Sequence, residues 1–257
     1  MLKLYHWEPN ANIGKPMLAL KEKGVEFESV FIDLQKFEHH APEYLAINPL
    51  GVIPAMVHDG RSLYESTAIM EYVDAAFDGP PLRPADPVAR WRMRWWIKFA
   101  DEYHAPAISM TAWSRGGIAG GVEDRDDEAL RKRIEAIPQK ERQISWSKAL
   151  FGTFSPEEMA ESDRRVAYGA QVLEAALSRS PWLAGEDYSL ADMAAFCHCY
   201  MVPLRPEPAI NDRDTPHVME WLRRIYERPA TKETWKLGRR WNLDRIAHLK
   251  RPEQASA

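Results

Sequence analysis

Hydrophobic and polar positions divide the chain into a first part with short alternating segments and a second part with longer helical periods. Residues 2–6 alternate apolar and polar side chains and predict a short strand. After a loop rich in turn residues, Pro16 is expected to open a helix that Gly24 closes. A second strand begins near Phe27. Strand, helix and strand form a βαβ unit, whose two strands should be parallel.

A hairpin and a helix follow in the pattern. Two apolar segments flank Asp59 and Gly60, a dipeptide typical of a tight hairpin turn, so their strands should run antiparallel. The amphipathic segment TAIMEYVDAAF then predicts a helix for which Ser66 is a suitable N-cap. The order βαβ-ββα over residues 1–78 is that of a thioredoxin-like domain.

The second part of the chain reads as all-helical. Residues 79–87 are rich in proline and predict a linker, and residues 88–257 form the expected helical domain. One of its helices starts at Ser189, where Asp192 completes a capping-box pattern. The last long periodic segment ends near Arg228 and Pro229, and the polar tail from Arg245 onward is expected to be loosely ordered.

Residues 115–158 look like an insertion between two helices of the bundle. Their periodicity after Asp124 predicts some helix. Two interpretations stay open for this segment: a surface insertion without a role at the site, or a wall over a substrate pocket.

The composition is that of an ordinary globular protein. The chain has 257 residues, of which 45% are hydrophobic and 28% charged, and its net charge of -4 gives no general attraction for nucleic acid. No segment resembles a signal peptide or is apolar over a bilayer's width, so we expect a cytoplasmic protein without membrane partners. Cys197 and Cys199 flank a histidine, but alternate helix positions point in different directions, so we expect packing and no metal.

Three motifs in the first part carry a family resemblance. N-P-L-G-V-I-P-A-M, then D-G, then E-S-T-A-I-M-E-Y-V resemble the glutathione-binding half of glutathione S-transferases. The resemblance implies a cis peptide before Pro54, and a backbone at Val52 and Ile53 that pairs with the cysteinyl part of glutathione. It also implies that Glu65 and Ser66 bind the γ-glutamyl end.

Physical chemistry agrees with this assignment. The amides of Ser66 and Thr67 lie at a helix N-terminus, which favours a carboxylate, and Glu65 can pair with the ammonium group of the ligand. Taken singly, Ser66 is equally well explained as a simple cap, and Pro54 as the end of a loop. The whole series in this order favours glutathione as co-substrate.

The chemistry requires a group that stabilises the thiolate of glutathione, because a free thiol has a pKa of about 8.5. In the superfamily, a tyrosine, serine or cysteine after the first strand does this. None occurs in the loop HWEPNANIGK. We expect Asn12 to donate its amide N–H to the sulfur, helped by the following helix. The alternative is that Asn12 only shapes the turn; His6 should point away by strand alternation.

Within the superfamily, nearly the whole chain is most similar to the bacterial glutathione-dependent β-etherases, which cleave β-aryl ether bonds of lignin-derived dimers. The similarity rests on L-K-L-Y, A-N followed by K-P, K-F-E-H-H, L-R-P-A-D-P and a tryptophan-rich helix. It implies that His40 lies near the glycine end of glutathione, although a solvated surface histidine fits as well. The serine expected after Asn12 is replaced by Ile13.

The resemblance leads to two hypotheses of function. The first is an enzyme in which the glutathione thiolate displaces a phenolate from the carbon beside a ketone. The second is a non-catalytic or weakly active glutathione-binding subunit of a heterodimeric transferase. A homo- or heterodimer is implied in either case. The aromatic residues expected to line the electrophile pocket, which core or dimer packing would also explain, are Trp96, Phe99, Tyr103 and Trp113.

Overall fold

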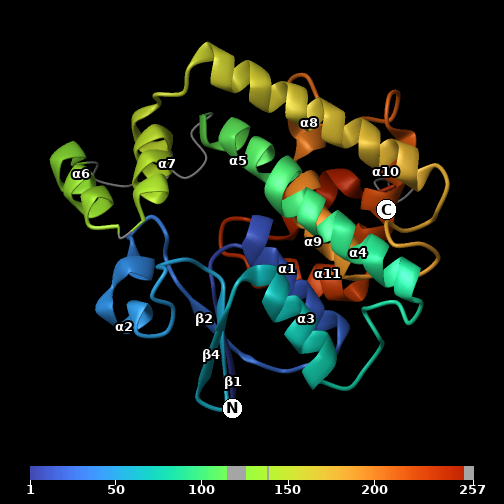
Figure 1. Ribbon diagram of the computed structural model, residues 1–257, viewed down its shortest axis with the longest axis horizontal. Coiled ribbons are helices and arrows are strands. Elements are labelled where there is room, and N and C mark those ends of the chain that lie inside the picture. The colour runs from blue at the N-terminus through green and yellow to red at the C-terminus, as the bar shows by residue number, and fades with distance from the viewer. Residues whose placement is uncertain (115–125, 138, 252–257) are drawn as a thin grey trace.

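A four-stranded sheet forms the first part of the molecule, with the strand order β2-β1-β3-β4 (Figure 1). The computed structural model describes residues 1–114, 126–137 and 139–251. β1 pairs in parallel with β2 and antiparallel with β3, which pairs antiparallel with β4. This confirms the predicted βαβ-ββα order. The strands are β1 (Leu2–His6), β2 (Glu28–Phe31), β3 (Ala55–His58) and β4 (Arg61–Tyr64).

The β3–β4 hairpin turns on two residues with left-handed backbone. Asp59 has a φ of 49° and Gly60 a φ of 79°. Positive φ at both central residues is what a type I′ turn requires, and this turn matches the twist of the strands that it joins. The sequence prediction of a tight turn at Asp59-Gly60 is confirmed.

The helices of the first part begin at different residues from those predicted. α1 starts at Ala11, so Pro16 lies inside it, and the prediction that Pro16 opens the helix is wrong. A proline in a helix removes one backbone hydrogen bond, here to the carbonyl of residue 12. Residues 13–20 are all buried, and this packing outweighs the local preference. The helical elements are α1 (Ala11–Glu22), η1 (Glu38–His40), α2 (Pro42–Leu45) and α3 (Ser66–Ala76).

The elements of the second part are all helices within its described residues, as predicted, apart from an isolated bridge between Trp182 and Gly185. α4, η2 and α5 follow one another without a break, and η2 is a single π-helical turn, a feature that is frequent at functional sites. The elements are α4 (Pro87–Phe99), η2 (Ala100–His104), α5 (Ala105–Ser114), α6 (Asp127–Glu135), α7 (Lys140–Phe151), α8 (Pro156–Leu177), α9 (Leu190–Cys199), η4 (Val202–Leu204), α10 (Pro216–Glu227), α11 (Pro229–Trp235) and η5 (Leu243–Leu249).

α9 is the central helix of this part, since every one of its residues is buried. The predicted capping box is present: Ser189 caps the helix and the Asp192 carboxylate accepts from the Ser189 N–H at 2.9 Å. Asp192 also accepts from the indole of Trp221 at 2.9 Å. Both Cys197 and Cys199 are packed in this helix as free thiols. α1 packs against α9 and α3, so the loop before α1 lies where the two parts of the molecule meet.

The insertion forms helices, as its periodicity predicted. α6 and α7 stand beside the segment that carries η1 and α2 (Figure 1). Phe37 from that segment shares a separate apolar cluster with Ile134, Trp146 and Leu150 of the insertion. The insertion therefore packs against the first part of the molecule; residues 115–125 and 138 of it lie outside the described residues.

The segment after α11 is folded. η5 buries Ile246 and Leu249 completely, so the prediction of a loosely ordered tail is wrong for residues 245–251, and residues 252–257 lie outside the described part. Ile246 and Leu249 are three residues apart, so both lie on the face of this turn that contacts the core. The polar residues between and around them made the segment look like a loose tail in the sequence. None of the described helices has the length and apolar character needed to cross a membrane.

Candidate active site

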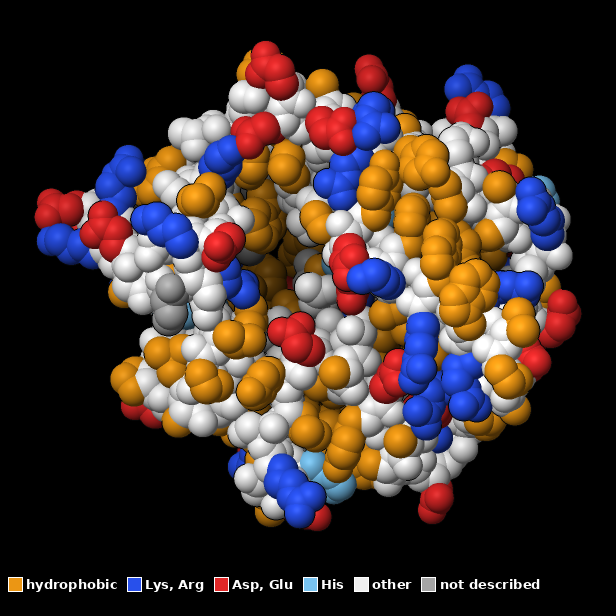
Figure 2. All heavy atoms as spheres, in the orientation of Figure 1, with side chains coloured by type: hydrophobic (Ala, Val, Ile, Leu, Met, Phe, Trp, Pro, Cys, Tyr) orange, Lys and Arg blue, Asp and Glu red, His pale blue; other side chains and the backbone are white. Residues whose placement is uncertain are grey.

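Two cavities meet beside the N-terminus of α1. Figure 2 shows the surface hollowed between α7 and the sheet-bearing part, with hydrophobic side chains in the depth of the hollow. We call the first the polar cavity; it is lined by Asn12, Leu50, Val52, Ile53, Pro54, Glu65, Ser66, Gln139 and Arg142. The second, the aromatic cavity, has a volume of about 230 Å³ and is lined mainly by apolar and ring side chains of both parts. The residues that line both, which we call the seam, are Asn12, Val52, Ile53 and Arg142.

The wall of the polar cavity includes an extended segment with unused backbone groups. The bond between Ile53 and Pro54 is cis, as the resemblance implied. The Val52 carbonyl is fixed by the Asn48 amide at 2.7 Å and by the Tyr44 hydroxyl. Within the described residues, neither the N–H nor the C=O of Ile53 forms a hydrogen bond. These two groups are therefore available to an extended peptide ligand.

The start of α3 forms the other end of the polar cavity. Ser66 is the first helical residue and Glu65 is the N-cap, so the prediction of Ser66 as N-cap is wrong. Glu65 has a φ of 72°, a conformation that costs about 1–3 kcal/mol in a non-glycine residue and occurs mainly at functional sites. No side chain caps the helix, which leaves the N–H groups of its first turn for a ligand carboxylate. Thr67 lies in that first turn, half-buried, and does not line the cavity.

His40 lies next to the polar cavity and not among the residues that line it. Its ring stands against Gly51, whose φ is 57° and where an added Cβ would lie only 2.7 Å from the ring. Its neighbour His39 is buried and lines the aromatic cavity instead. Burial lowers the pKa of His39 to about 2, so this ring is neutral.

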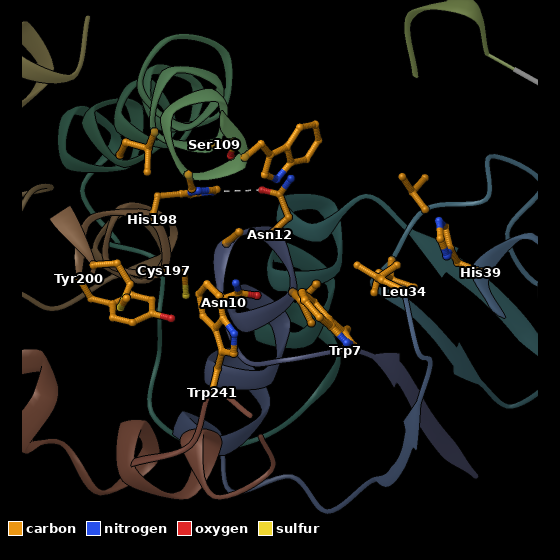
Figure 3. A pocket seen from close by; sticks show the side chains of 18 of the residues that line it. Trp7, Asn10, Asn12, Leu34, His39, Ser109, Cys197, His198, Tyr200 and Trp241 are labelled. Atoms are coloured by element: carbon orange, nitrogen blue, oxygen red, sulfur yellow. Dashed lines mark hydrogen bonds between the residues drawn. The ribbon is translucent and has the colours of Figure 1, made fainter. Parts of the chain in front are cut away.

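The Asn12 side chain is held at the seam by two donors. Lys15 Nζ donates to Asn12 Oδ1 at 2.8 Å, and His198 Nε2 lies 3.2 Å from the same oxygen (Figure 3). An ammonium can only donate, so the amide atom that Lys15 contacts must be the oxygen. Burial lowers the pKa of His198 well below its ordinary value, so its ring is neutral. The Asn12 Nδ2 group therefore remains as the free donor of this exposed side chain.

Lys15 is a buried cation that links the two parts of the molecule. Its side chain is fully buried, and its ammonium pairs with the Asp101 carboxylate as well as with Asn12. Asp101 belongs to the π-helical turn η2, which interrupts the regular helix at this point. A buried ammonium needs such partners, because desolvation without them costs several kcal/mol.

Aromatic rings from distant segments build the aromatic cavity. The ring centroids of Trp7 and Trp241 lie 6.5 Å apart, and those of Trp113 and Trp146 lie 6.4 Å apart. Figure 3 shows Trp7, Trp241 and Tyr200 around the same space as Asn12. Ile13, at the position where the family resemblance implied a serine, is buried and also lines it.

Of the four aromatic residues predicted to line the pocket, the structure places only Trp113 there. Trp96, on α4, is buried in the core. Phe99 and Tyr103 belong to a row of stacked rings with centroids 5.3 Å apart, which continues to Trp95 and lies away from both cavities. From helical periodicity, these rings were expected on several faces of their helix. Periodicity does not indicate which of those faces adjoins the pocket.

Sequence reasoning missed several cavity residues. Trp241 lies just before the tail that was predicted to be loosely ordered, and Trp146 and Arg142 come from the insertion. The insertion thus contributes walls to both cavities, which favours the second of the two interpretations given above. His6 Nδ1 donates to the Trp7 carbonyl at 2.6 Å, and its Nε2 accepts from the Ser29 hydroxyl at 2.6 Å. His6 is absent from both linings, in line with its predicted direction.

Two family models match the chain. The glutathione S-transferase N-terminal domain matches residues 1–75 and the glutathione S-transferase C-terminal domain matches residues 121–229. Protein LigF of Sphingobium sp. (strain NBRC 103272 / SYK-6) is 40% identical over 94% of this chain and 96% of its own. Glutathione S-transferase F9 of Arabidopsis thaliana is 32% identical over 87% of this chain and 92% of its own.

A solved structure extends this similarity to three dimensions. The crystal structure described as beta-etherase LigF from Sphingobium sp. strain SYK-6 superposes with a TM-score of 0.86. The match covers 91% of this chain and 98% of that one, at 40% identity.

The position of Trp241 depends on Glu8, and this yields a prediction. The buried Glu8 carboxylate accepts from the backbone N–H groups of Arg239, Arg240 and Trp241 at 3.0, 3.1 and 3.0 Å. Glu8→Ala leaves these donors without an acceptor, and we expect a loss of about 3 kcal/mol in the free energy of unfolding. Urea unfolding measures that loss, and amide hydrogen exchange should show faster exchange in residues 239–241.

The control for this prediction is Glu186→Ala, which removes an exposed carboxylate. Unchanged stability and exchange in Glu8→Ala would show that the Glu8 carboxylate does not hold residues 239–241.

Proposed function

The chain belongs to the glutathione S-transferase family, and from that premise we propose that it is a β-etherase. Its proposed reaction is displacement of a phenolate from an aromatic β-aryl ether ketone, of the kind derived from lignin, by the thiolate of glutathione. The observation that carries this proposal is the Asn12 amide, held with its donor free between a cavity for a peptide and a cavity for aromatic groups.

The polar cavity suits glutathione in one orientation. The γ-glutamyl carboxylate fits the first turn of α3 at Ser66, and Glu65 is placed for the ammonium group. The cysteinyl backbone can pair with the free N–H and C=O of Ile53. Its sulfur then lies at the seam, beside Asn12. The start of α1 adds the positive end of a helix dipole to that position.

Asn12 stabilises the thiolate in this proposal, as a hydroxyl does elsewhere in the superfamily. Its Nδ2 group donates to the sulfur, while Lys15 and His198 keep the carbonyl end of the amide turned away. The Lys15 ammonium donates to the carbonyl end of the amide and so polarises it, which makes the Nδ2 group a stronger donor. Both effects favour the ionised thiol over the neutral one.

The displacement balances without a further co-reactant. The sulfur lone pair forms a C–S bond to the carbon beside the ketone, and the electron pair of the C–O bond leaves with the phenolate. The ketone makes that carbon electrophilic, and the phenolate takes up a proton after release. The aromatic cavity offers flat apolar walls for both rings of such a substrate, from Trp7, Trp113, Trp146 and Trp241.

The non-catalytic alternative has less support. The similarity to LigF spans nearly the full length of both chains, and the crystal structure of that protein is described as a beta-etherase. Glu65 and the free backbone of Ile53 would serve glutathione binding under either hypothesis. The feature that favours the enzyme is the free donor of Asn12 at the seam, which a subunit that only binds glutathione does not require.

Turnover tests the proposal. The purified chain with glutathione and a β-aryl ether ketone that carries a chromophoric phenol should release the phenol and form the glutathione thioether. Asn12→Ala should lower kcat/KM about 100-fold, the usual effect of removing one donor to a developing or resident anion. Asn12→Ser, which restores a donor, should recover part of that loss. Glutathione binding without phenol release by the unmodified chain would sink the etherase proposal and support the binding-subunit hypothesis.

We also propose that two copies of the chain associate through the exposed aromatic side chains Trp91 and Trp95 of α4 and Tyr168 of α8. Trp91, Trp95 and Tyr168 are 62%, 41% and 53% exposed, which is unusual for large aromatic side chains. Sedimentation velocity should show a dimer, and Trp95→Glu should shift it toward a monomer because a charge there opposes burial. A monomer for the unmodified chain at all concentrations would exclude this interface.

A further inference from the structure

Arg142 is the charged residue of the seam, and it comes from the insertion. It lies in the first turn of α7 and lines the polar cavity and the aromatic cavity at once. α7 is fixed against the sheet-bearing part through Trp146, which stacks on His39 with a centroid distance of 5.6 Å. The position of Arg142 at the cavity is therefore set by a packed element and not by a free loop.

Within the described residues, the guanidinium of Arg142 forms no hydrogen bond and no ion pair, and its Nε atom is buried without an acceptor. Burial lowers the pKa of Arg142, and the negative charge of Glu65 acts against this change. An arginine nevertheless keeps its charge at neutral pH.

A partly buried cation without a partner is costly, because its desolvation is not compensated. In a cavity that takes a ligand, the compensation can come from an anion of the ligand. A planar guanidinium matches a carboxylate with two parallel hydrogen bonds. Glutathione carries two carboxylates, one at each end of the tripeptide.

The surroundings of Arg142 distinguish the two ends. The first turn of α3 already offers its N–H groups to the γ-glutamyl carboxylate. Arg142 interacts electrostatically with Glu65 at the start of α3 on one side, and with His39 and His40 of the η1 segment and Tyr44 of α2 on the other. In the proposed orientation, the cysteine of glutathione lies at Ile53 and its γ-glutamyl end at α3. The glycine end then extends in the other direction, toward the segment of η1 and α2.

We propose that Arg142 binds the glycine-end carboxylate of glutathione, so that a helix of the insertion takes part in recognising the co-substrate. This inference rests on the glutathione orientation given above and is independent of the ether-cleavage step. The insertion then covers the tripeptide in the polar cavity, and it also forms part of the wall of the aromatic cavity. Gln139, whose Oε1 atom is buried without a partner, adds an acceptor on the same side of the cavity.

Calorimetric titration tests this assignment by changing the ligand and the protein in parallel. The two ligands are glutathione and its monoethyl ester at the glycine carboxyl, and the proteins are the unmodified chain and Arg142→Met. We expect Arg142→Met to weaken glutathione binding at least 10-fold, the usual effect of losing a hydrogen-bonded charge pair. The ester should bind the unmodified chain more weakly than glutathione does, and it should bind both proteins equally.

The design separates the possible failures. Lys140→Met removes an exposed cation from the same helix and should leave both affinities unchanged, which controls for general electrostatics. The ester measured on the unmodified chain needs no folded variant. Equal losses for glutathione and the ester in Arg142→Met, or no loss for either ligand, would overturn the assignment. Because only binding is measured, the role of Arg142 is tested equally well in a chain that has no etherase activity.

Discussion

The contact of Lys15 with Asn12 and Asp101 is the interaction on which the site depends. Lys15 is fully buried and can only donate, so acceptors must lie beside its ammonium group. This requirement fixes the positions of the Asn12 amide oxygen and the Asp101 carboxylate. Asn12 belongs to the first helix of the sheet-bearing part and Asp101 to the helical part. One buried ammonium therefore sets the direction of the proposed thiolate donor and joins the two halves of the site.

The insertion gives the site its second constraint. α7 supplies Trp146 to the aromatic cavity and Arg142 to the seam, and its apolar face packs on the segment around Phe37. The cavities are thus enclosed by elements far apart in the sequence: the loop before α1, the inserted helices, α9 and the segment held by Glu8. The apolar wall on the aromatic side of the seam reduces the screening by water there and strengthens the effect of each charge and dipole on the sulfur.

Local patterns were sufficient to predict the order of strands and helices in the first part, the hairpin turn and the capping box, because each depends on neighbours in the sequence. The glutathione motifs around Pro54 and Glu65 were likewise readable as continuous segments. Pro16 and Ser66 were misplaced by a few residues because tertiary packing and a strained backbone at Glu65 override helix-end preferences.

Residues whose roles depend on packing between distant elements could not be predicted. Nothing in the sequence near Lys15 indicates Asp101 or His198 as neighbours, since their approach depends on the π-helical turn and on α9. The same holds for Trp241, and for Phe99 and Tyr103, whose rings lie on an outer face. Asn12 was identified because the expected hydroxyl and thiol side chains are missing from its loop, and the orientation of its amide came only from the structure.

The most direct test of the proposed thiol activation is the pKa of the glutathione thiol in the binary complex. Ultraviolet difference titration follows the thiolate band as pH is raised, with S-methylglutathione as the blank for the protein's own absorbance. The Asn12 donor, polarised by Lys15 and helped by the start of α1, should bring the thiol pKa clearly below its free value of about 8.5, so that thiolate is present at neutral pH. A bound thiol that titrates at or above the free value would contradict the role of Asn12 and Lys15.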